Sequence, residues 1–173
     1  MSDFEKTGDW EEVKRVIASI SGNMQMARKT SLMRFGLKAE GIAKKHISAQ
    51  DLPWKPLKAA TIRRKSNAGY STNILTETST YFRSITSYVV GETAYAGVKR
   101  DVKEDDGTLV ADIAKLHEYG SLSGKIPARE LWLPTFEETV TWHIKSNQPA
   151  KIFVDIMKNQ FPKLFGTKVR TKK

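Results

Sequence analysis

Residues 84–98, SITSYVVGETAYAGV, decide the fold class. The first part, Ser84–Val90, is rich in β-branched and aromatic side chains, which favour extended strands. Gly91 and Glu92 then supply a turn, and Thr93–Val98 alternates again between larger and smaller side chains. The stretch therefore predicts a β-hairpin in a chain whose other regular segments have a helical pattern.

Upstream of the hairpin, Glu11–Gln50 carries apolar residues at helical spacing, with lysines and arginines between them. Gly and Asn both favour the left-handed conformation that ends helices. Ser21–Asn23 therefore predicts a break between a short helix and a longer one that ends near Ile47. The prolines within residues 51–57 cannot continue a helix. The polar, lysine-rich segment up to Thr76 then predicts a long, mobile, basic loop.

Downstream of the hairpin the pattern is irregular before helices return. Lys103–Gly107 predicts a charged loop, Thr108–Val110 allows another strand, and Asp112–Tyr119 predicts a helical turn. The fold class we expect is α+β, with N-terminal helices and C-terminal helices packed on a small antiparallel β-sheet and joined by long mobile loops.

Two helices are predicted near the C-terminus. Thr135 and Glu138 have the spacing of a capping box, in which the threonine hydroxyl accepts from the Glu138 amide, so a helix should open at Pro134 and run to about Lys145. A second helix, with Pro149 in its first turn, should run from there to the Phe-Pro pair at 161–162. We expect one α+β domain over residues 1–162 and a basic, flexible tail over 163–173.

Composition limits the class of protein. The sequence has 173 residues, which suffice for one domain with its own core, and it has no cysteine, which excludes disulfides, thiolate nucleophiles and cysteine zinc sites. No apolar run reaches the roughly 18 residues of a membrane span, and the acidic N-terminal segment is unlike a basic secretory signal. We therefore expect a soluble protein with no membrane partner.

Charge is unevenly distributed along the sequence. The formal net charge is +10, and residues 1–12 carry five acidic side chains and one basic, whereas residues 14–68 carry thirteen basic and two acidic ones. A region this basic permits contact with a polyanion such as nucleic acid. Solvated helix faces give the same count more often, so charge alone does not establish the partner.

Patterns of catalytic and ligand-binding residues give no site. His117 and Glu118 supply only one of the two histidines of a metallopeptidase helix. Lys103 and Asp106 occupy positions where a calcium loop needs an oxygen ligand and a glycine. The glycines that follow His117 lack the strand and helix that flank a phosphate-binding loop. We therefore assign no catalytic, cofactor-binding or metal-binding residue, and we interpret His117 as structural.

Three patches of the sequence match one family pattern, in the family's order. They are Trp54, Pro56, Leu57 and Thr61; Leu75, Thr78, Ser84 and Ile85; and His117, Glu118, Gly120 and Ile126–Arg129. On these residues the chain resembles the phage virion-morphogenesis proteins of the tail-completion and head-tail joining type. Ser79 and Tyr81 stand where that family has glycine and leucine. After Arg129, Glu130 and Leu131 replace its usual Pro-Phe.

The resemblance implies a structural function. Proteins of this type are small α+β proteins that assemble as rings between the capsid portal and the tail. We therefore expect a non-enzymatic virion protein of a tailed phage or prophage, without a cofactor, in the neck or tail of a particle assembled in the host bacterial cytoplasm. Its expected partners are copies of itself, other neck, portal-side or tail-tube proteins, and, non-specifically, the DNA that traverses the neck. Two alternatives stay open: a basic DNA-binding protein, and a small hydrolase that uses His117 with Glu118.

The candidate contact residues for such a ring are Trp54, Arg63, Arg64, Lys65, Asp105, Asp106, Ile126, Pro127 and Arg129. Complementary charge steers association and suppresses wrong partners. We therefore expect the basic loop around residues 58–74 of one subunit to meet the acidic turn at residues 101–107, or the acidic N-terminus, of another. In the third patch, Gly120–Gly124 predicts a flexible loop and Ile126-Pro127 an extended exit, after which Arg129 can hold a carboxylate or carbonyl groups.

Overall fold

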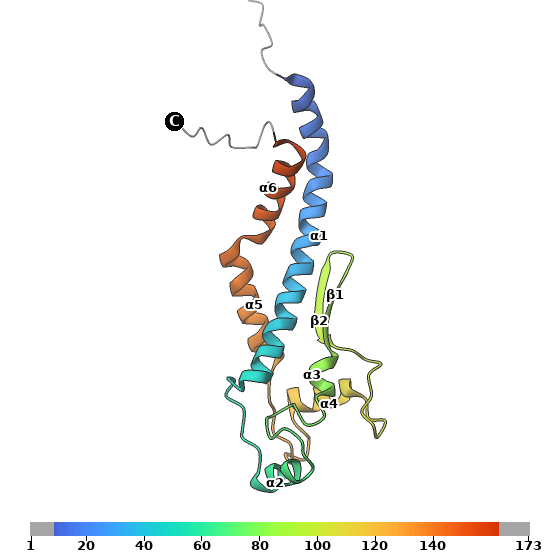
Figure 1. The fold of residues 1–173 in the computed structure, drawn as a ribbon, viewed down its shortest axis with the longest axis vertical. Helices are drawn as coiled ribbons and strands as arrows, with labels where there is room; N and C mark the ends of the chain where they lie inside the picture. Colours follow the sequence, from blue (N-terminus) through green and yellow to red (C-terminus); the bar gives the residue numbers. More distant parts are fainter. Residues whose placement is uncertain (1–8, 163–173) are drawn as a thin grey trace, which may run out of the picture. The chain divides into compact units, whose positions relative to one another are not determined.

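The computed structural model describes residues 9–162, which have a mostly helical α+β fold (Figure 1). In chain order the elements are α1 (Trp10–Ala49), α2 (Ala59–Asn67), α3 (Thr80–Ser84), β1 (Ile85–Val90), β2 (Thr93–Val98), α4 (Val110–Tyr119), α5 (Trp132–Ser146) and α6 (Gln148–Gln160). The α+β class is confirmed, and so is the predicted last helix, α6, with Pro149 in its first turn. The flexible tail predicted over 163–173 lies outside the described residues. No helix within residues 9–162 is long and apolar enough to cross a membrane.

The described residues form two compact units. The first contains residues 9–31 and 147–162, and in it α6 packs against the N-terminal part of α1, with Asn23 bonded to Gln160. The second contains residues 32–146, and in it α5 packs against the C-terminal part of α1 through aromatic side chains. The single domain expected over residues 1–162 stays a prediction.

α1 continues without a break through Ser21–Asn23, so the predicted interruption is wrong. Asn23 is only 3% exposed, and its side-chain amide donates to the Gln160 side chain (2.7 Å) and to the Ser19 hydroxyl (3.2 Å). These partners satisfy the asparagine without a left-handed backbone. A single glycine such as Gly22 costs a helix only about 1 kcal/mol, which a helix of this length tolerates.

β1 and β2 form the predicted hairpin, a two-stranded antiparallel sheet. Gly91 in the turn has a φ of 56°, a conformation that glycine adopts at little cost. The inner face of the hairpin lies against α1, where a Cβ added to Gly36 would stand 3.2 Å from the Ser87 Cβ. The absence of a side chain at residue 36 therefore lets the sheet approach the helix.

Residues 59–67 form helix α2, although the sequence predicted a loop there. Two cationic side chains of this helix, Arg64 and Lys65, bind groups in the segment that follows it. The Arg64 guanidinium donates to both carboxylate oxygens of Glu77, at 2.6 and 2.8 Å. The Lys65 ammonium donates to the Asn73 carbonyl at 2.6 Å. These contacts hold the helix against residues 73–77.

The region after the hairpin also differs from the prediction. The strand allowed at Thr108–Val110 does not form, because Leu109 makes only an isolated bridge with Lys103 and the next residue begins α4. The charged loop predicted before it and the helical turn predicted over Asp112–Tyr119 are both confirmed.

α5 begins at Trp132, two residues before the predicted start, and ends at Ser146 as expected. The predicted capping box is wrong. The Thr135 hydroxyl is buried inside the first turn, where it donates to the Leu131 carbonyl (2.6 Å) instead of accepting from an amide. The acceptor that does cap this helix comes from another element and is described below.

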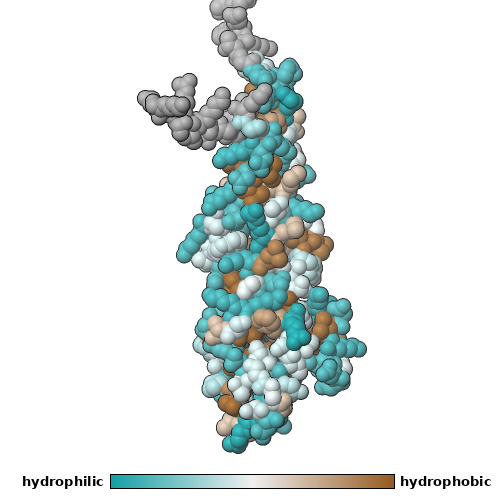
Figure 2. Space-filling model, in the orientation of Figure 1, coloured by the Kyte–Doolittle hydropathy of each residue, from teal (hydrophilic) through white to brown (hydrophobic). Residues whose placement is uncertain are grey.

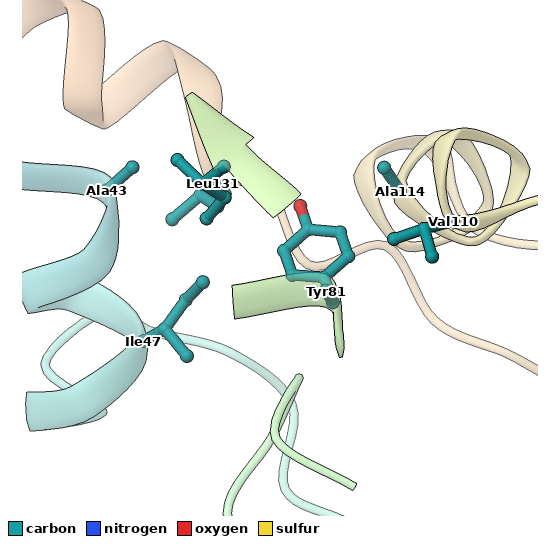
Figure 3. Close-up of a cluster of buried hydrophobic side chains, with 7 residues drawn as sticks. Ala43, Ile47, Tyr81, Val110, Ala114 and Leu131 are labelled. Atoms are coloured by element: carbon teal, nitrogen blue, oxygen red, sulfur yellow. The ribbon is translucent and has the colours of Figure 1, made fainter. Parts of the chain in front are cut away.

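The core of the second unit forms where α1, α3, β1, α4 and the residue before α5 converge (Figure 3). Its buried apolar side chains are Ala43, Ile47, Tyr81, Ile85, Val110, Ala114 and Leu131. Trp54 and Leu75 pack against this cluster from the flanking loops and are partly buried. The core thereby fixes the loop segments that surround the site described next.

Candidate functional site

A cavity of about 650 Å³ lies in the second unit, between α2, the loop after it, the acidic turn and the segment that follows α4. Much of its wall is apolar, with contributions from Pro56, Leu57, Ile74, Leu75, Ile126 and Pro127. Cationic side chains also line it, together with acidic side chains from residues 77 and 104–106. Ligand pockets commonly have this size and this mixture of apolar wall and a few charged groups.

Residues from all three family-like patches line this cavity. They are Pro56, Leu57 and Thr61 of the first patch, Leu75 and Thr78 of the second, and His117, Ile126, Pro127 and Arg129 of the third. The remaining patch residues do not line it. Ile85 is in the core, and the Trp54 indole donates to the Glu130 carbonyl at 2.8 Å.

Most of the predicted contact residues line the same cavity, and two do not. Arg64, Lys65, Asp105, Asp106, Ile126, Pro127 and Arg129 line it, whereas Trp54 and Arg63 do not. Arg63 is exposed on α2. The basic and acidic segments that we expected to meet between subunits therefore lie on one cavity of one chain, and their contact between subunits stays a prediction.

The segment after α4 closes on itself by backbone hydrogen bonds. The Arg129 amide donates to the His117 carbonyl (2.6 Å), and the Ser121 amide donates to the Ile126 carbonyl (2.9 Å). The Ile126 amide returns a bond to the Ser121 hydroxyl (2.9 Å). Gly120, with a φ of 78°, lies where a Cβ would stand 2.9 Å from the Ala128 nitrogen. The segment predicted as a flexible loop is thus a bonded turn whose close backbone approach requires glycine at 120.

Glu118 caps helix α5. Its two carboxylate oxygens accept from the amides of Leu131 (2.9 Å), the residue before α5, and of Trp132 (3.2 Å), the first residue of α5. A negative charge at a helix N-terminus is also favoured by the helix dipole. Sequence reasoning missed this function, and the carboxylate is bound to the helix start instead of to the neighbouring His117.

Two cationic side chains are buried at the cavity. Lys65 is 3% exposed and Arg129 is 6% exposed, and burial lowers the pKa of both. Arg129 donates from Nε to the Lys55 carbonyl (3.4 Å), which fits the predicted carbonyl contact. Among residues 9–162, neither cation has a carboxylate oxygen within the 4 Å of an ion pair.

His117 lies beside these cations, with Nδ1 3.5 Å from a terminal nitrogen of Arg129. Burial, and then the positive charges of Arg129 and Lys65, lowers the pKa of His117 to about 4. The imidazole is therefore neutral near pH 7 and can accept a hydrogen bond from the guanidinium.

Three acidic side chains of the wall come from residues 104–106, and two of them accept hydrogen bonds from neighbouring groups. Asp105 and Asp106 are exposed. Asp106 accepts from the Thr108 amide (2.9 Å), which lowers the pKa of its carboxyl. Glu104 accepts from the Thr78 hydroxyl (2.8 Å). These three acids therefore line the cavity without forming an ion pair with the buried cations, and Glu77, the fourth acid of the wall, is paired with Arg64.

A second candidate surface is the outer face of the hairpin. Tyr88 and Tyr95 stack there with ring centroids 5.2 Å apart, although they are 56% and 46% exposed, and Val90 is exposed beside them. We call these three residues the outer hairpin face. Apolar side chains also interrupt the hydrophilic surface elsewhere (Figure 2). Within residues 9–162, no further strand pairs with the free edge of β1 or β2.

Neither a search for metal-binding groups nor a comparison with known proteins assigns a function to this site. In the part of the chain that the structure describes, no group of three or more histidine and acidic side chains could hold a metal ion. Comparison with known proteins finds no matching family model, no matching curated protein and no matching solved structure.

Proposed function

We propose that this protein is a non-enzymatic structural component of a tailed-phage or prophage virion that completes the tail, or joins head and tail, as a homo-oligomeric ring. The observation that carries the proposal is the convergence of residues from the three family-like patches on one cavity. Pro56 and Arg129 stand far apart in the sequence, yet both belong to its wall. Patches matched only by chance have no reason to build one site.

The hairpin gives independent support for self-association. A ring of identical subunits needs a contact between two different surfaces of each copy, repeated around an axis. Exposed strand edges and aromatic side chains favour such contacts, because edges can pair with another strand and tyrosines are enriched at interfaces. Both strands have a free edge within the described residues, and Tyr88 and Tyr95 are exposed next to them.

The two alternatives have less support. A hydrolase that uses His117 with Glu118 would need the two side chains to act together, but the Glu118 carboxylate accepts from the amides that begin α5. A DNA-binding function would rest on net charge alone. A steep fall in duplex affinity with rising salt would favour it.

Native mass spectrometry combined with negative-stain imaging of the full chain tests the proposal. We expect a closed ring with a fixed number of subunits, formed by the chain alone or on isolated tails. Particles assembled without the protein should then contain filled capsids and finished tails that are not joined, and addition of the purified protein should join them. Normal joining in its absence would refute the proposed function.

A further inference from the structure

The buried cations of the cavity form no ion pair within residues 9–162, although the charge of Glu77, which is paired with Arg64, acts on Lys65 from farther away. Lys65 and Arg129 are both more than nine-tenths buried and both line the cavity, and the acids of residues 9–162 form no ion pair with them. An unpaired charge held away from water is costly, and a hydrogen-bonded carboxylate removes most of that cost. Buried cations of this kind are typical of an anion-binding site.

The apolar residues of the wall indicate what kind of chemical group is attached to this anion. Leu57, Ile74, Leu75, Ile126 and Pro127 make an apolar lining. A free phosphate or a nucleic-acid backbone would leave this surface without contacts. A carboxylate next to an aromatic or aliphatic side chain would fill it, because the Arg129 guanidinium can bind both carboxylate oxygens while the apolar group packs beside it.

Asp105 and Asp106 limit which anionic ligands the cavity can bind. Asp105 and Asp106 are exposed at the cavity, and their charge disfavours long polyanions such as DNA. This repulsion acts on either acidic partner considered above, so the apolar wall has to decide between them. The acidic turn of another copy has no aromatic side chain, and its Val102 packs against the core of its own subunit. The acidic N-terminal segment remains. Residues 3–5, Asp-Phe-Glu, place two carboxylates around one aromatic side chain.

We propose that the cavity binds an acidic, aromatic peptide segment and that Asp3–Glu5 of a second copy supplies it. This inference rests on the proposed function, since it assigns one of the contacts between neighbouring subunits. In it, Arg129 and Lys65 bind the carboxylates and Phe4 packs on the apolar wall.

A peptide titration tests the site. The receptor is the full chain with Asp3→Asn and Glu5→Gln, so that its own segment does not compete, and the probe is a labelled peptide of residues 1–12. We expect Lys65→Met to weaken binding at least tenfold, because a charge-assisted hydrogen bond is lost. This change replaces a buried charge with an apolar side chain of similar length. Because it also removes the bond to the Asn73 carbonyl, the helical circular dichroism signal and the unfolding midpoint of the variant are compared with those of the parent before the titration. Arg63→Gln, which removes an exposed charge of the same helix outside the cavity, should leave the affinity unchanged.

Two further arms define the ligand. A peptide with Asp3→Asn and Glu5→Gln should bind at least tenfold more weakly than the natural one. Inorganic phosphate at equal concentration should not displace the natural peptide. Equal binding to the Lys65→Met and Arg63→Gln receptors, or displacement by phosphate, would overturn the inference.

Zero-length cross-linking of carboxylates to lysines tests whether a second copy supplies the segment. Lys125 is exposed and lines the cavity, so it should couple to Asp3 or Glu5. In a mixture of light and heavy isotope-labelled protein, we expect cross-linked peptides that combine both labels. Products with one label only would show that each chain uses its own segment, which contradicts the inference and leaves the ring itself in place. The proposed function is tested separately, by asking whether particles assembled without the protein contain capsids and tails that are not joined.

Discussion

Gly120 shows how a single residue shapes the wall of the cavity. Its φ of 78° and the 2.9 Å separation between an added Cβ and the Ala128 nitrogen leave no space for a side chain. The backbone bonds that close this turn run on both sides of it, from His117 to Arg129 and from Ser121 to Ile126. A change at residue 120 should therefore disturb the turn and the cations beside it.

We expect Gly120→Ala to lower the free energy of unfolding by about 2–4 kcal/mol, because a left-handed backbone and a steric overlap both penalise the methyl group. Gly124→Ala is the matched control. Gly124 also has a positive φ (67°) but has no atom within 4 Å of an added Cβ, so it should lose only about 1 kcal/mol. Urea unfolding of the two variants measures the difference. Equal losses would show that the close approach at residue 120 has no energetic weight.

His117 should make stability depend on pH. The unfolded chain protonates this histidine near pH 6.5, whereas burial and the neighbouring cations Arg129 and Lys65 lower its folded pKa to about 4. The unfolded state therefore binds the proton more readily, and this contribution to stability is complete above pH 6.5 and is lost as the pH falls towards 4. An NMR titration of the imidazole should give a folded pKa near 4. A value near 6.5 would contradict the buried, cation-flanked environment.

At the scale of elements, local patterns predicted those structures whose partners are neighbours in the sequence. The hairpin is one such case, because its alternation and its turn lie within residues 84–98. The failures have partners that lie outside the local pattern. Asn23 stays in a helix because Gln160 binds it, and α2 is held by Asn73 and Glu77. No pattern within one helix reveals those contacts.

Glu118 explains the failed capping box in the same way. The sequence contains a plausible local cap for α5, but the acceptor comes from α4. We expect Glu118→Ala to destabilise the protein by about 1–2 kcal/mol, the usual cost of a lost helix cap. Glu137→Ala removes an exposed carboxylate of α5 itself and should cost less than about 0.5 kcal/mol. Thermal unfolding compares the two variants, and a similar loss in both would argue against the cap.

The outer hairpin face leads to a prediction about assembly. Replacing Tyr88 with serine removes an exposed aromatic ring and its stacking with Tyr95. Tyr88 is not part of the core, so the core should stay unchanged. We expect Tyr88→Ser to reduce the fraction of protein in rings at a fixed concentration while the helical circular dichroism signal stays unchanged. Tyr119→Ser is the control, because Tyr119 is an exposed tyrosine of α4 and not one of the three residues of the outer hairpin face. If both variants assemble like the natural protein, the hairpin is not a contact surface.

At the scale of the whole molecule, the sequence predicted the α+β class but not the division of the chain into two compact units. Residues 9–31 belong with 147–162 and the intervening chain forms its own unit, an arrangement that depends on pairs far apart in sequence. The cavity has the same origin. Seven of the proposed contact residues line it, but the sequence placed the acidic and basic ones on opposite sides of a subunit boundary. Their common position became visible only when the helices and loops were folded together.

This common position changes what neutralising the acidic turn should do. If the acidic turn of one copy met the basic segment of another, Asp105→Asn with Asp106→Asn would weaken self-association. Because both residues lie on the cavity that we assign to the acidic N-terminal segment, we expect the double variant to associate more strongly at low salt. An asparagine at 106 keeps the acceptor for the Thr108 amide, so the turn itself should persist.

Sedimentation of the full chain at about 0.02 M and about 0.5 M salt measures this effect, since the Debye length falls from roughly 20 Å to roughly 4 Å between these conditions. The gain in association should vanish at high salt, and Asp3→Asn with Glu5→Gln should show the opposite change at low salt. Glu130→Gln with Glu137→Gln removes two exposed charges outside the cavity and controls for net charge. Weaker association of the Asp105 and Asp106 variant, with the control unchanged, would instead identify the acidic turn as the contact between subunits.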